Sequence, residues 1–304
     1  MPSVSSLDEA AGALAAAHAE GRRLRIGEDL TAHGLDQVLE HDPGDLTCTV
    51  EAGVRLSGLR AALAASGQRL SLDPPGDPTI GALLARNVSG PLRHRFGAPR
   101  DLVLGATLVL ADGTIASAGG KVVKNVAGYD LARLVCGSEG RLAFIARASF
   151  RLHPLPGASR TLVIETDDAA IAVAALMRSH LQPSALDVLH PGRVAVLFEG
   201  SERAVAAQLD TARSLVGGAE ADTAVWDESR SRQGAATGRL RFAPGELAEA
   251  LTSLSDAVVR PASGVAYAAD PMPSDTASQG ASRTAPDELV ARIQRELDPR
   301  GVLS

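Results

Sequence analysis

Apolar positions in the first half of the chain alternate between helical and strand spacing. Ser6-Leu7-Asp8-Glu9 has the form of a capping box and opens a helical pattern to about Ala19, which Gly21 ends. Asp112-Gly113 between two apolar runs predicts a hairpin turn. The patterns together predict an α+β domain with strands at 24–26, 45–50, 102–110, 114–118 and 144–152, and with further helices at 57–66 and 79–86, the last with Thr79 as its N-cap.

The pattern changes after His153-Pro154-Leu155-Pro156-Gly157, which breaks the last of these strands and predicts a domain boundary. The order of elements that follows, β-α-β-β-α-β, favours a smaller ferredoxin-like α/β sandwich. Its strands are predicted at 161–165, 185–189, 193–198 and 221–226, its helices at 168–180 and 201–215, and an extension of its sheet at 239–268. The predicted domains are 1–156, then 157–285 with a linker rich in Pro, Ser, Asp and Thr at 270–285, then 286–304, a C-terminal helix that returns to the first domain.

Composition and charge narrow the class of protein. The chain has 304 residues, of which 45% are hydrophobic, and this supports a sizeable core. Its net charge of -6 argues against nucleic acid as a partner. Two cysteines, Cys48 and Cys136, cannot build a disulfide framework or ligate an iron–sulfur cluster, so we interpret them as small buried residues. No apolar run reaches membrane-spanning length and no signal peptide is recognisable, so we expect a cytoplasmic protein.

Three segments have the residue types that bind a bulky anionic cofactor. The loop 73–78 leads into the predicted helix at Thr79, whose first amides suit a pyrophosphate. Residues 87–101 combine small polar groups with arginines, and glycine-bearing loops at 119–130 and 137–140 flank a short apolar segment. Each segment alone is better explained as a turn or a solvated basic patch, but their order and spacing together favour a cofactor site.

Several other binding motifs are excluded by the residues themselves. Gly120-Lys121 is not a Walker A loop, because Ile115 stands where its first glycine is required and Val122 replaces the Ser or Thr. No G-x-G-x-x-G follows a predicted strand, and no nucleophile elbow is found. The histidines are scattered without metal-ligand spacing, so no metal site is predicted.

Four stretches resemble the FAD-binding domain of the vanillyl-alcohol oxidase superfamily, the PCMH type. The run Lys121-Val122-Val123-Lys124-Asn125-Val126-Ala127-Gly128-Tyr129-Asp130 is especially similar to the smaller FAD-binding subunits of the glycolate oxidase family. Gly137-Ser138-Glu139-Gly140-Arg141-Leu142, Thr79-Ile80-Gly81 and Asn87-Val88-Ser89-Gly90-Pro91 resemble the superfamily's other cofactor loops. The similarity extends from about Ser5 to Pro156 and returns at 297–303.

The resemblance implies a PCMH-type domain of two α+β subdomains that holds non-covalent FAD between them. It implies a FAD-dependent oxidoreductase subunit of a complex that oxidises glycolate or another 2-hydroxy acid, in an accessory or electron-relay role. The implied partners are a larger catalytic FAD subunit and an iron–sulfur subunit, through which the chain could associate peripherally with a membrane. The cofactor-binding residues implied are Pro75, Gly76, Asp77, Thr79, Ile80, Gly81, Asn87, Ser89, Gly90, Arg95, Gly97, Lys124, Asn125, Gly128, Tyr129, Asp130, Gly137, Ser138, Glu139, Gly140 and Leu142.

One departure from the family keeps two alternatives open. Arg25-Ile26-Gly27-Glu28-Asp29-Leu30 stands where the family has Arg-Gly-Gly-Gly-Thr/Ser, and its two acids would repel a pyrophosphate; Arg141 and Ala143 also replace small family residues. A flavin-free structural subunit is therefore one alternative, and a stand-alone FAD-dependent oxidoreductase is the other. No catalytic residue is assigned, because the nearby candidates for 2-hydroxy acid chemistry, His180, His190 and Arg193, are better explained as surface or turn residues. Neither His33 nor His94 is adopted as a covalent flavin attachment site.

Overall fold

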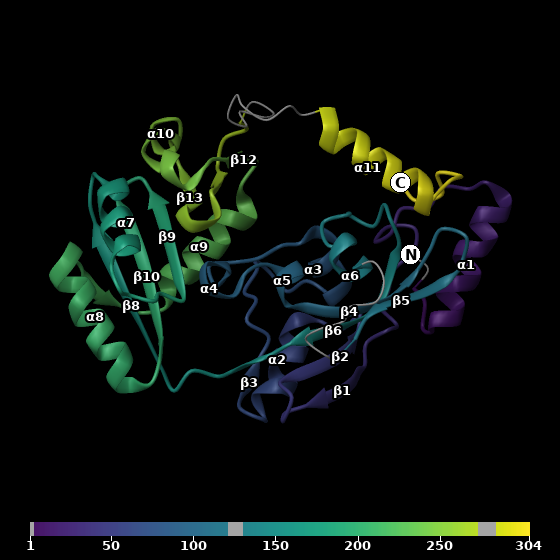
Figure 1. Ribbon diagram of the computed structural model, residues 1–304, viewed down its shortest axis with the longest axis horizontal. Helices are drawn as coiled ribbons and strands as arrows, with labels where there is room; N and C mark the ends of the chain where they lie inside the picture. The colour runs from purple at the N-terminus through teal and green to yellow at the C-terminus, as the bar shows by residue number, and fades with distance from the viewer. Residues whose placement is uncertain (1–2, 121–129, 273–283) are drawn as a thin grey trace.

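The computed structural model describes residues 3–120, 130–272 and 284–304, and these form two lobes that lie side by side (Figure 1). Each lobe is built on its own antiparallel sheet, and the predicted boundary at 153–157 falls between the last strand of one sheet and the first strand of the other. Both ends of the described chain lie in the first lobe (Figure 1). The sequence-based prediction of an α+β fold is confirmed.

The sheet of the first lobe has the strand order β1-β2-β6-β4-β5. Its hairpin β4–β5 pairs Val109 with Ile115 across the predicted Asp112-Gly113 turn. The strands are β1 Val38–Asp42, β2 Thr47–Glu51, β4 Val103–Val109, β5 Ile115–Gly119 and β6 Phe144–Arg151, and a separate two-residue ladder joins β3 Gln68–Arg69 to β7 His153–Pro154. The helices are α1 Leu7–Glu20, α2 Leu56–Ala64, α3 Ile80–Arg86, α4 Arg93–Phe96, α5 Pro99–Leu102 and α6 Leu131–Leu134.

Local capping explains why α1 begins and ends where the sequence predicts. The Ser6 side chain accepts a hydrogen bond from the Glu9 backbone N–H, and Gly21 closes the helix at a φ of 64°, where a side chain would be strained. The predicted strand at 24–26 is wrong. Leu24 and Ile26 make only isolated bridges, because the chain turns at once through Gly27, which has a φ of 96°.

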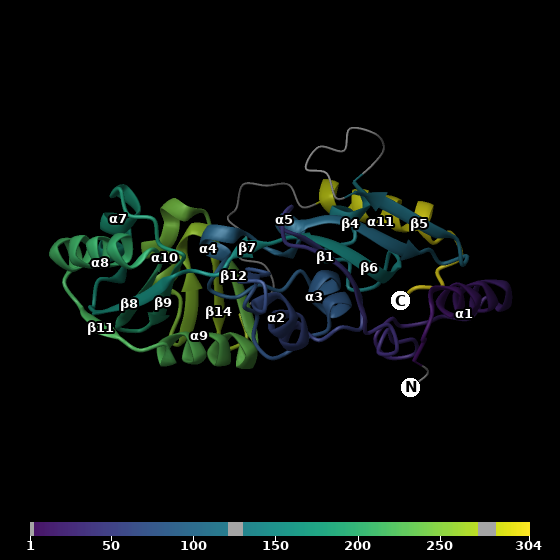
Figure 2. The ribbon, with the colours of Figure 1, turned by 90° about the horizontal axis from the view of Figure 1, so that it is seen from below.

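The core of the first lobe lies between its sheet and helices α2 and α3. Leu56, Leu59 and Leu63 of α2 are fully buried at helical spacing. Burial raises the pKa of the Cys48 thiol to about 12, and Cys48 therefore behaves as the small buried residue that the sequence predicted. Helix α11 (Thr284–Leu297) returns to this lobe, where Ile293 and Leu297 pack against the same core (Figure 2).

The second lobe contains a seven-stranded sheet in the order β11-β8-β10-β9-β13-β14-β12. Its first four strands have the ferredoxin-like arrangement that the sequence predicted, with β10 inserted between β8 and β9, and the last three extend the sheet. The strands are β8 Ala158–Glu165, β9 Ala185–His190, β10 Arg193–Gly200, β11 Ala219–Ala221, β12 Gly238–Arg241, β13 Ala257–Arg260 and β14 Val265–Ala268. The helices are α7 Ala169–Arg178, α8 Glu202–Val216, α9 Ala224–Ala235 and α10 Leu247–Thr252, with short 3-10 turns at Pro244–Glu246 and Pro261–Ser263.

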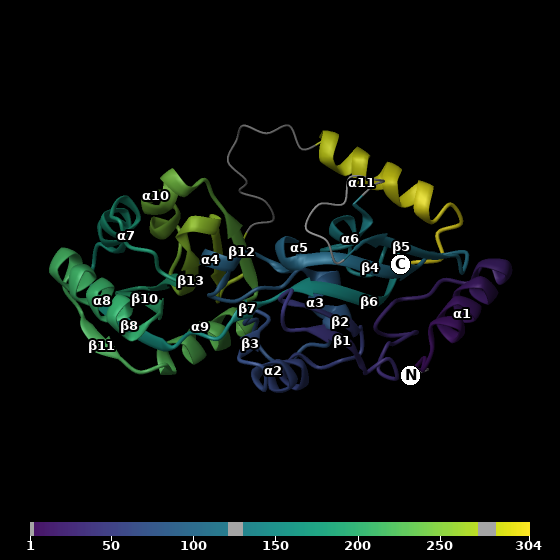
Figure 3. The ribbon, with the colours of Figure 1, turned by 60° about the horizontal axis from the view of Figure 1, so that its bottom comes forward.

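The two faces of this sheet have different partners. Helices α7, α8 and α10 cover one face, and α9 lies on the other, against the first lobe (Figure 3). Successive side chains of β9 point to opposite faces of the sheet. Leu186 and Val188 therefore pack toward α7 and α8, while Asp187 faces α9. The strand predicted at 221–226 is wrong: the chain makes the short β11 and then enters α9, whose buried face carries Ser229 and Gln233 and so lacks a helical apolar pattern.

Candidate functional site

A cleft with a volume of about 450 Å³ opens in the first lobe. One wall is the turn from Arg25 to His33, and the opposite wall is formed by α3 together with Glu139 and Gly140. Its volume lies within the range of small-molecule and cofactor sites, about 300–1,000 Å³. The cleft is therefore the candidate functional site of this lobe.

The turn that stands in place of the family's glycine-rich loop is closed by its own hydrogen bonds. The backbone N–H groups of Gly27, Glu28 and Asp29 all donate to carbonyl oxygens within the turn. The Asp29 carboxylate accepts the Arg25 backbone N–H at 2.9 Å, and this bond lowers the pKa of Asp29. The Arg25 guanidinium lies 2.6 Å from Glu28 and 3.4 Å from Asp29. The acids that the sequence set against a pyrophosphate are thus already paired with Arg25.

The first amides of α3 are also engaged, contrary to the prediction of free donors there. Ile80 donates to the Val54 carbonyl and Gly81 to the Ala52 carbonyl, while Ala82 donates to the Thr79 hydroxyl. Carbonyls of the segment that follows β2 take these bonds, which could not be inferred from the sequence around Thr79. A phosphate would have to displace them or bind through other groups.

Unpaired side-chain hydroxyls supply those other groups. Thr31 is 4% exposed and lines the cleft, and its hydroxyl has no hydrogen-bond partner among the described residues. The buried Ser138 hydroxyl is likewise unpartnered within the described chain, but Ser138 does not itself line the cleft and lies behind Glu139 of its wall. A buried polar group without a partner costs free energy, so a ligand that hydrogen-bonds it is favoured.

Arginine side chains add positive charge to the same cleft. Arg25 and Arg86 both line it, and Arg86 is an exposed residue. Guanidinium groups bind phosphate through paired hydrogen bonds. The Thr31 hydroxyl and the Arg86 guanidinium therefore fit the polar groups of FAD, whereas Arg25 is paired with acids and Glu28 and Glu139 line the same cleft.

The 137–140 loop and α3 are held together as one unit. Gly137 donates to the Leu84 carbonyl and Glu139 to the Ala85 carbonyl. At Gly140, with a φ of 80°, a Cβ would lie 2.8 Å from the Ile26 Cβ, so only glycine allows this approach between the loop and the opposite wall. The loop therefore sets the width of the cleft.

The structure brings together some of the residues predicted from the sequence and separates others. Asp77 holds the first turn of α2, accepting hydrogen bonds from the Ser57 backbone and hydroxyl at 2.8 Å each, and Asp130 caps α6. Thr79, Gly81, Glu139 and Gly140 line the cleft, Ile80 and Leu142 are buried in the core, and Pro75 and Gly76 line a second cavity. Outside the cleft, Asn87 caps α3, the Ser89 carbonyl accepts a hydrogen bond from Gln233, Gly90 lies against Asp73, Arg95 lines a small cavity with residues of α7, and Gly97 ends α4. Lys124, Asn125, Gly128 and Tyr129 lie outside the described residues.

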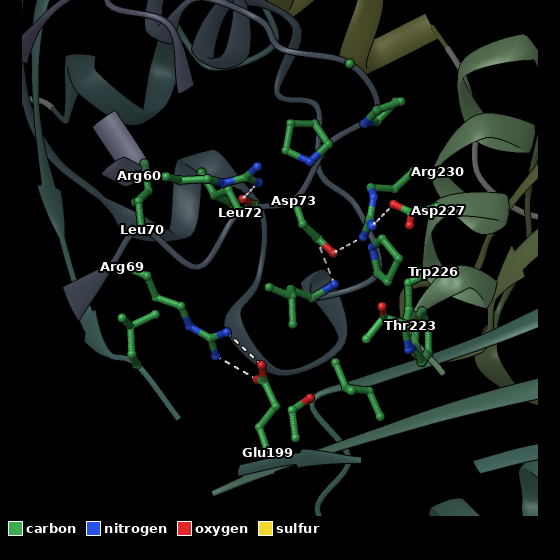
Figure 4. A pocket seen from close by; sticks show the side chains of 18 of the residues that line it. Arg60, Arg69, Leu70, Leu72, Asp73, Glu199, Thr223, Trp226, Asp227 and Arg230 are labelled. Carbon is green, nitrogen blue, oxygen red and sulfur yellow. Dashed lines mark hydrogen bonds and ion pairs between the residues drawn. The ribbon is translucent and has the colours of Figure 1, made fainter. Parts of the chain in front are cut away.

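The second cavity, of about 820 Å³, lies between the lobes (Figure 4). Arg69 of the first lobe and Glu199 of the second form a two-pronged ion pair across it, at 2.7 and 2.6 Å. Asp73 accepts the Leu92 backbone N–H at 3.0 Å and lies 3.6 Å from Arg230 of α9. Burial raises the pKa of Asp73 to about 7 against the opposing effect of nearby arginines.

A cationic and aromatic cluster on the second lobe was missed from the sequence. The guanidinium carbons of Arg239 and Arg260 lie 5.7 and 5.0 Å from the centre of the Tyr267 ring. Register explains the grouping, since Arg239 pairs directly with Tyr267 across β12 and β14. The strands β12 and β14 are neighbours in the sheet but lie apart in the sequence, so the sequence alone gives no signal that Arg239 and Tyr267 meet.

Comparison with known proteins identifies the first lobe. The family described as FAD binding domain matches residues 29–119, which include the Leu30–His33 part of the cleft wall and all of α3. This segment is a PCMH-type FAD-binding domain. Its cofactor is FAD, and the chain is related to FAD-dependent oxidoreductases.

Relatives extend the similarity beyond the matched segment. The chain is 34% identical over 218 residues to glycolate oxidase subunit GlcE of Escherichia coli, covering 68% of this chain and 61% of that protein. It is 37% identical over 160 residues to glycolate oxidase subunit GlcD of Bacillus subtilis, covering 51% of this chain and 34% of that protein. A D-lactate dehydrogenase of Saccharomyces cerevisiae is 32% identical over 171 residues, 54% of this chain and 29% of that protein. The chain thus spans about three-fifths of the first relative and about a third of the others.

Solved structures support the fold of both lobes. An alkyldihydroxyacetonephosphate synthase superposes with a TM-score of 0.73, covering 99% of this chain and 75% of that chain at 16% sequence identity. Across the described residues, no helix is long and apolar enough to cross a membrane. Over the same ranges, no three His, Cys, Asp or Glu side chains are grouped to hold a metal ion.

Proposed function

We propose that this chain is the FAD-binding accessory subunit of a complex that oxidises a 2-hydroxy acid such as glycolate. The observation that carries the proposal is the first-lobe cleft, whose unpartnered Thr31 hydroxyl and Arg86 lie in the segment matched by the FAD-binding family. A relative that matches 68% of this chain is named as a glycolate oxidase subunit, which supports a role within an assembly. When bound, FAD supplies a two-electron acceptor.

In this proposal the chain's own residues hold the cofactor rather than act on substrate. Thr31 donates or accepts a hydrogen bond at the ribose or phosphate groups, and Arg25 and Arg86 face the negative charge. Partners of the complex are a larger catalytic FAD subunit and an iron–sulfur subunit, and the chain relays electrons between them.

The role is tested by reconstitution. The complex is assembled from the three subunits with and without this chain, and glycolate-dependent reduction of an artificial acceptor is measured. The proposal predicts that omission lowers the rate by at least an order of magnitude. An unchanged rate without the chain would show that the accessory role is wrong.

A second candidate function is oxidation of a carboxylate substrate by this chain alone. The observation in its favour is the Arg239 and Tyr267 pair, since the partly buried Arg239 guanidinium has no carboxylate partner within the described ranges. Burial, opposed by the nearby Tyr267, lowers the pKa of Arg239 from its ordinary value, and Arg241, Arg93 and Arg260 lower it further. Turnover of a 2-hydroxy acid by the isolated chain, abolished by Arg239→Met, would establish this function; absence of turnover in the FAD-loaded chain would exclude it.

A further inference from the structure

One carbonyl of the first lobe is held by two side chains of the second. The Ser89 carbonyl oxygen accepts a hydrogen bond from Gln233 Nε2 at 2.9 Å and another from Arg260 Nη1 at 3.3 Å. Ser89 is 1% exposed, Arg260 2% and Gln233 8%, so these contacts are shielded from water. The bonds join residues 144 and 171 positions apart in the sequence.

The two donors are themselves fixed. Arg260 Nη2 donates to Gln233 Oε1 at 2.7 Å, which leaves the amide nitrogen of Gln233 for Ser89 and so defines the orientation of that amide. Arg260 Nε lies 3.5 Å from Asp187, whose other oxygen accepts the Ser229 hydroxyl at 2.5 Å. Ser229 and Gln233 are one turn apart on α9, so one helix face supports both ends of the network.

A buried ionic network of this kind is weak evidence for stability, because apolar residues of similar volume would pack there at no greater cost. The network instead fixes the position of the Ser89 carbonyl, to which it donates two hydrogen bonds. The loop that it binds, residues 87–90, follows directly after Ala85 and Arg86 of the cleft wall.

The 87–90 loop is also held at both of its ends, so a displacement of Ser89 displaces its neighbours as well. Asn87 closes α3 in the left-handed region with a φ of 49°, and its side chain accepts the Arg100 backbone N–H at 3.2 Å. A Cβ at Gly90 would lie 1.8 Å from the Asp73 carbonyl oxygen, so this end of the loop rests directly on that backbone. A shift of Ser89 therefore has to move Asn87 and the end of α3.

We propose that Gln233 and Arg260 are positioning residues that act through the Ser89 carbonyl to fix the 87–90 loop and, through Asn87, the end of α3 that forms the wall of the cofactor cleft. The second lobe is then part of the cofactor site without touching the cofactor. This inference rests on the proposed function, since it takes the first-lobe cleft as the FAD site.

The test is the near-isosteric variant Gln233→Glu. It keeps an oxygen that accepts from Arg260 and replaces the donor to Ser89 by a second oxygen, which repels the carbonyl. The matched control is Gln208→Glu on α8, where the side-chain oxygen accepts the Gln182 backbone N–H at 2.8 Å and is retained by the substitution. Three quantities are measured in the full chain: hydrogen exchange of peptides that contain Val88 to Gly90 without cofactor, the dissociation constant of FAD, and the visible absorption spectrum of the bound flavin.

The proposal predicts that Gln233→Glu speeds exchange in the 87–90 loop and raises the FAD dissociation constant about tenfold, the effect of losing a buried hydrogen bond. It also predicts a shift in the visible absorption bands of the bound flavin, and the control leaves all three unchanged. Unchanged exchange would overturn the contact itself, and faster exchange with unchanged affinity and spectrum would overturn its role toward the cofactor.

The test also covers two other cases, a variant that does not fold and a wild-type chain that binds no FAD. If Gln233→Glu does not fold, Gln233→Met removes the same donor without adding charge, and the same outcomes apply. If the wild-type chain binds no FAD, the proposed function fails, and the exchange measurement still decides whether Gln233 holds the loop.

Discussion

Two regions use the same chemistry, an arginine beside acids, in opposite surroundings. One is the exposed turn at Arg25, and the other is the buried contact between the lobes at Arg260 and Ser89, which we call the seam. The side chains of Arg25 and Glu28 are 57% and 61% exposed, whereas those of Arg260 and Asp187 are 3% and 0% exposed. Water screens the first pair, so it adds little free energy. In the second pair each charge depends on its partner, because neither can be hydrated. The first region can therefore change its contacts when a ligand arrives, while the second holds the lobes in one arrangement.

The largest expected effect comes from breaking the buried pair. Arg260→Met leaves the Asp187 carboxylate buried without a counter-ion, and we expect the free energy of unfolding to fall by about 3–5 kcal/mol in urea titrations. Arg25→Met, the control in the exposed turn, should change it by about 1 kcal/mol or less. Adding Asp187→Leu to Arg260→Met should restore much of the loss. Equal effects of Arg260→Met and Arg25→Met would contradict the comparison.

The pH dependence of the unfolding free energy tests Asp73, a first-lobe residue that lies 3.6 Å from Arg230 of the second lobe. Its pKa of about 7 in the folded protein exceeds the ordinary value of 3.8, so the folded state holds a proton that the unfolded chain has released. The stabilisation is therefore present at pH 4 and lost as the pH rises toward 7, at a rate of about 1.4 kcal/mol per pH unit between the two pKa values. Asp73→Asn keeps an acceptor for the Leu92 N–H and has no such dependence.

The measurement is the difference in unfolding free energy between wild type and Asp73→Asn across that range. We expect wild type to lose a few kcal/mol relative to the variant between pH 4 and pH 7. Parallel pH profiles would show that Asp73 does not titrate near neutrality.

The ion pair across the second cavity should give a smaller effect. Arg69→Lys keeps the charge and loses one of the two hydrogen bonds to Glu199, and we expect about 1–2 kcal/mol of destabilisation. Arg160→Lys, which alters an exposed pair with Glu202, should change the unfolding free energy by about 0.5 kcal/mol or less. Urea unfolding of the two variants decides whether the pair joins the lobes, since similar values would mean that it does not.

The smallest effect on stability is expected in the cleft. Thr31→Val keeps the side-chain shape and removes a buried hydroxyl that has no partner within the described chain, so the unfolding free energy should stay equal or rise slightly. FAD affinity should fall about tenfold in equilibrium titration. Thr211→Val on the second lobe, the control, should leave FAD affinity unchanged, and an equal response of both variants would remove Thr31 from the site.

Much of the fold could be predicted from the sequence because local signals decide it. Ser6 and Gly21 bound α1, Asp112-Gly113 makes the β4–β5 hairpin, and alternating apolar residues mark the ferredoxin-like strands. Helix α9 could not be predicted, since it buries Ser229 and Gln233 among polar partners from distant strands. Strand β1 was missed for the opposite reason, because Val38 and Leu39 are exposed and give no alternation.

The candidate site was predictable only in part. Residues such as Thr79 and Gly140 reach the cleft because a contiguous loop or helix carries them there. The engagement of the α3 amides depends on Ala52 and Val54, and the hold on Ser89 depends on Gln233 and Arg260. These contacts are set by how separate segments pack, which no local pattern encodes. Residues 124–129 lie outside the described residues, and their part in the site stays a prediction.

The most direct test of the account is the visible absorption spectrum of the purified chain, followed by acid release and identification of any cofactor. The account predicts one FAD per chain, either as purified or after titration, held although the Arg25–Leu30 turn replaces a glycine-rich loop. A colourless protein that stays colourless in excess FAD would contradict it, and would leave a flavin-free structural subunit as the function of this fold.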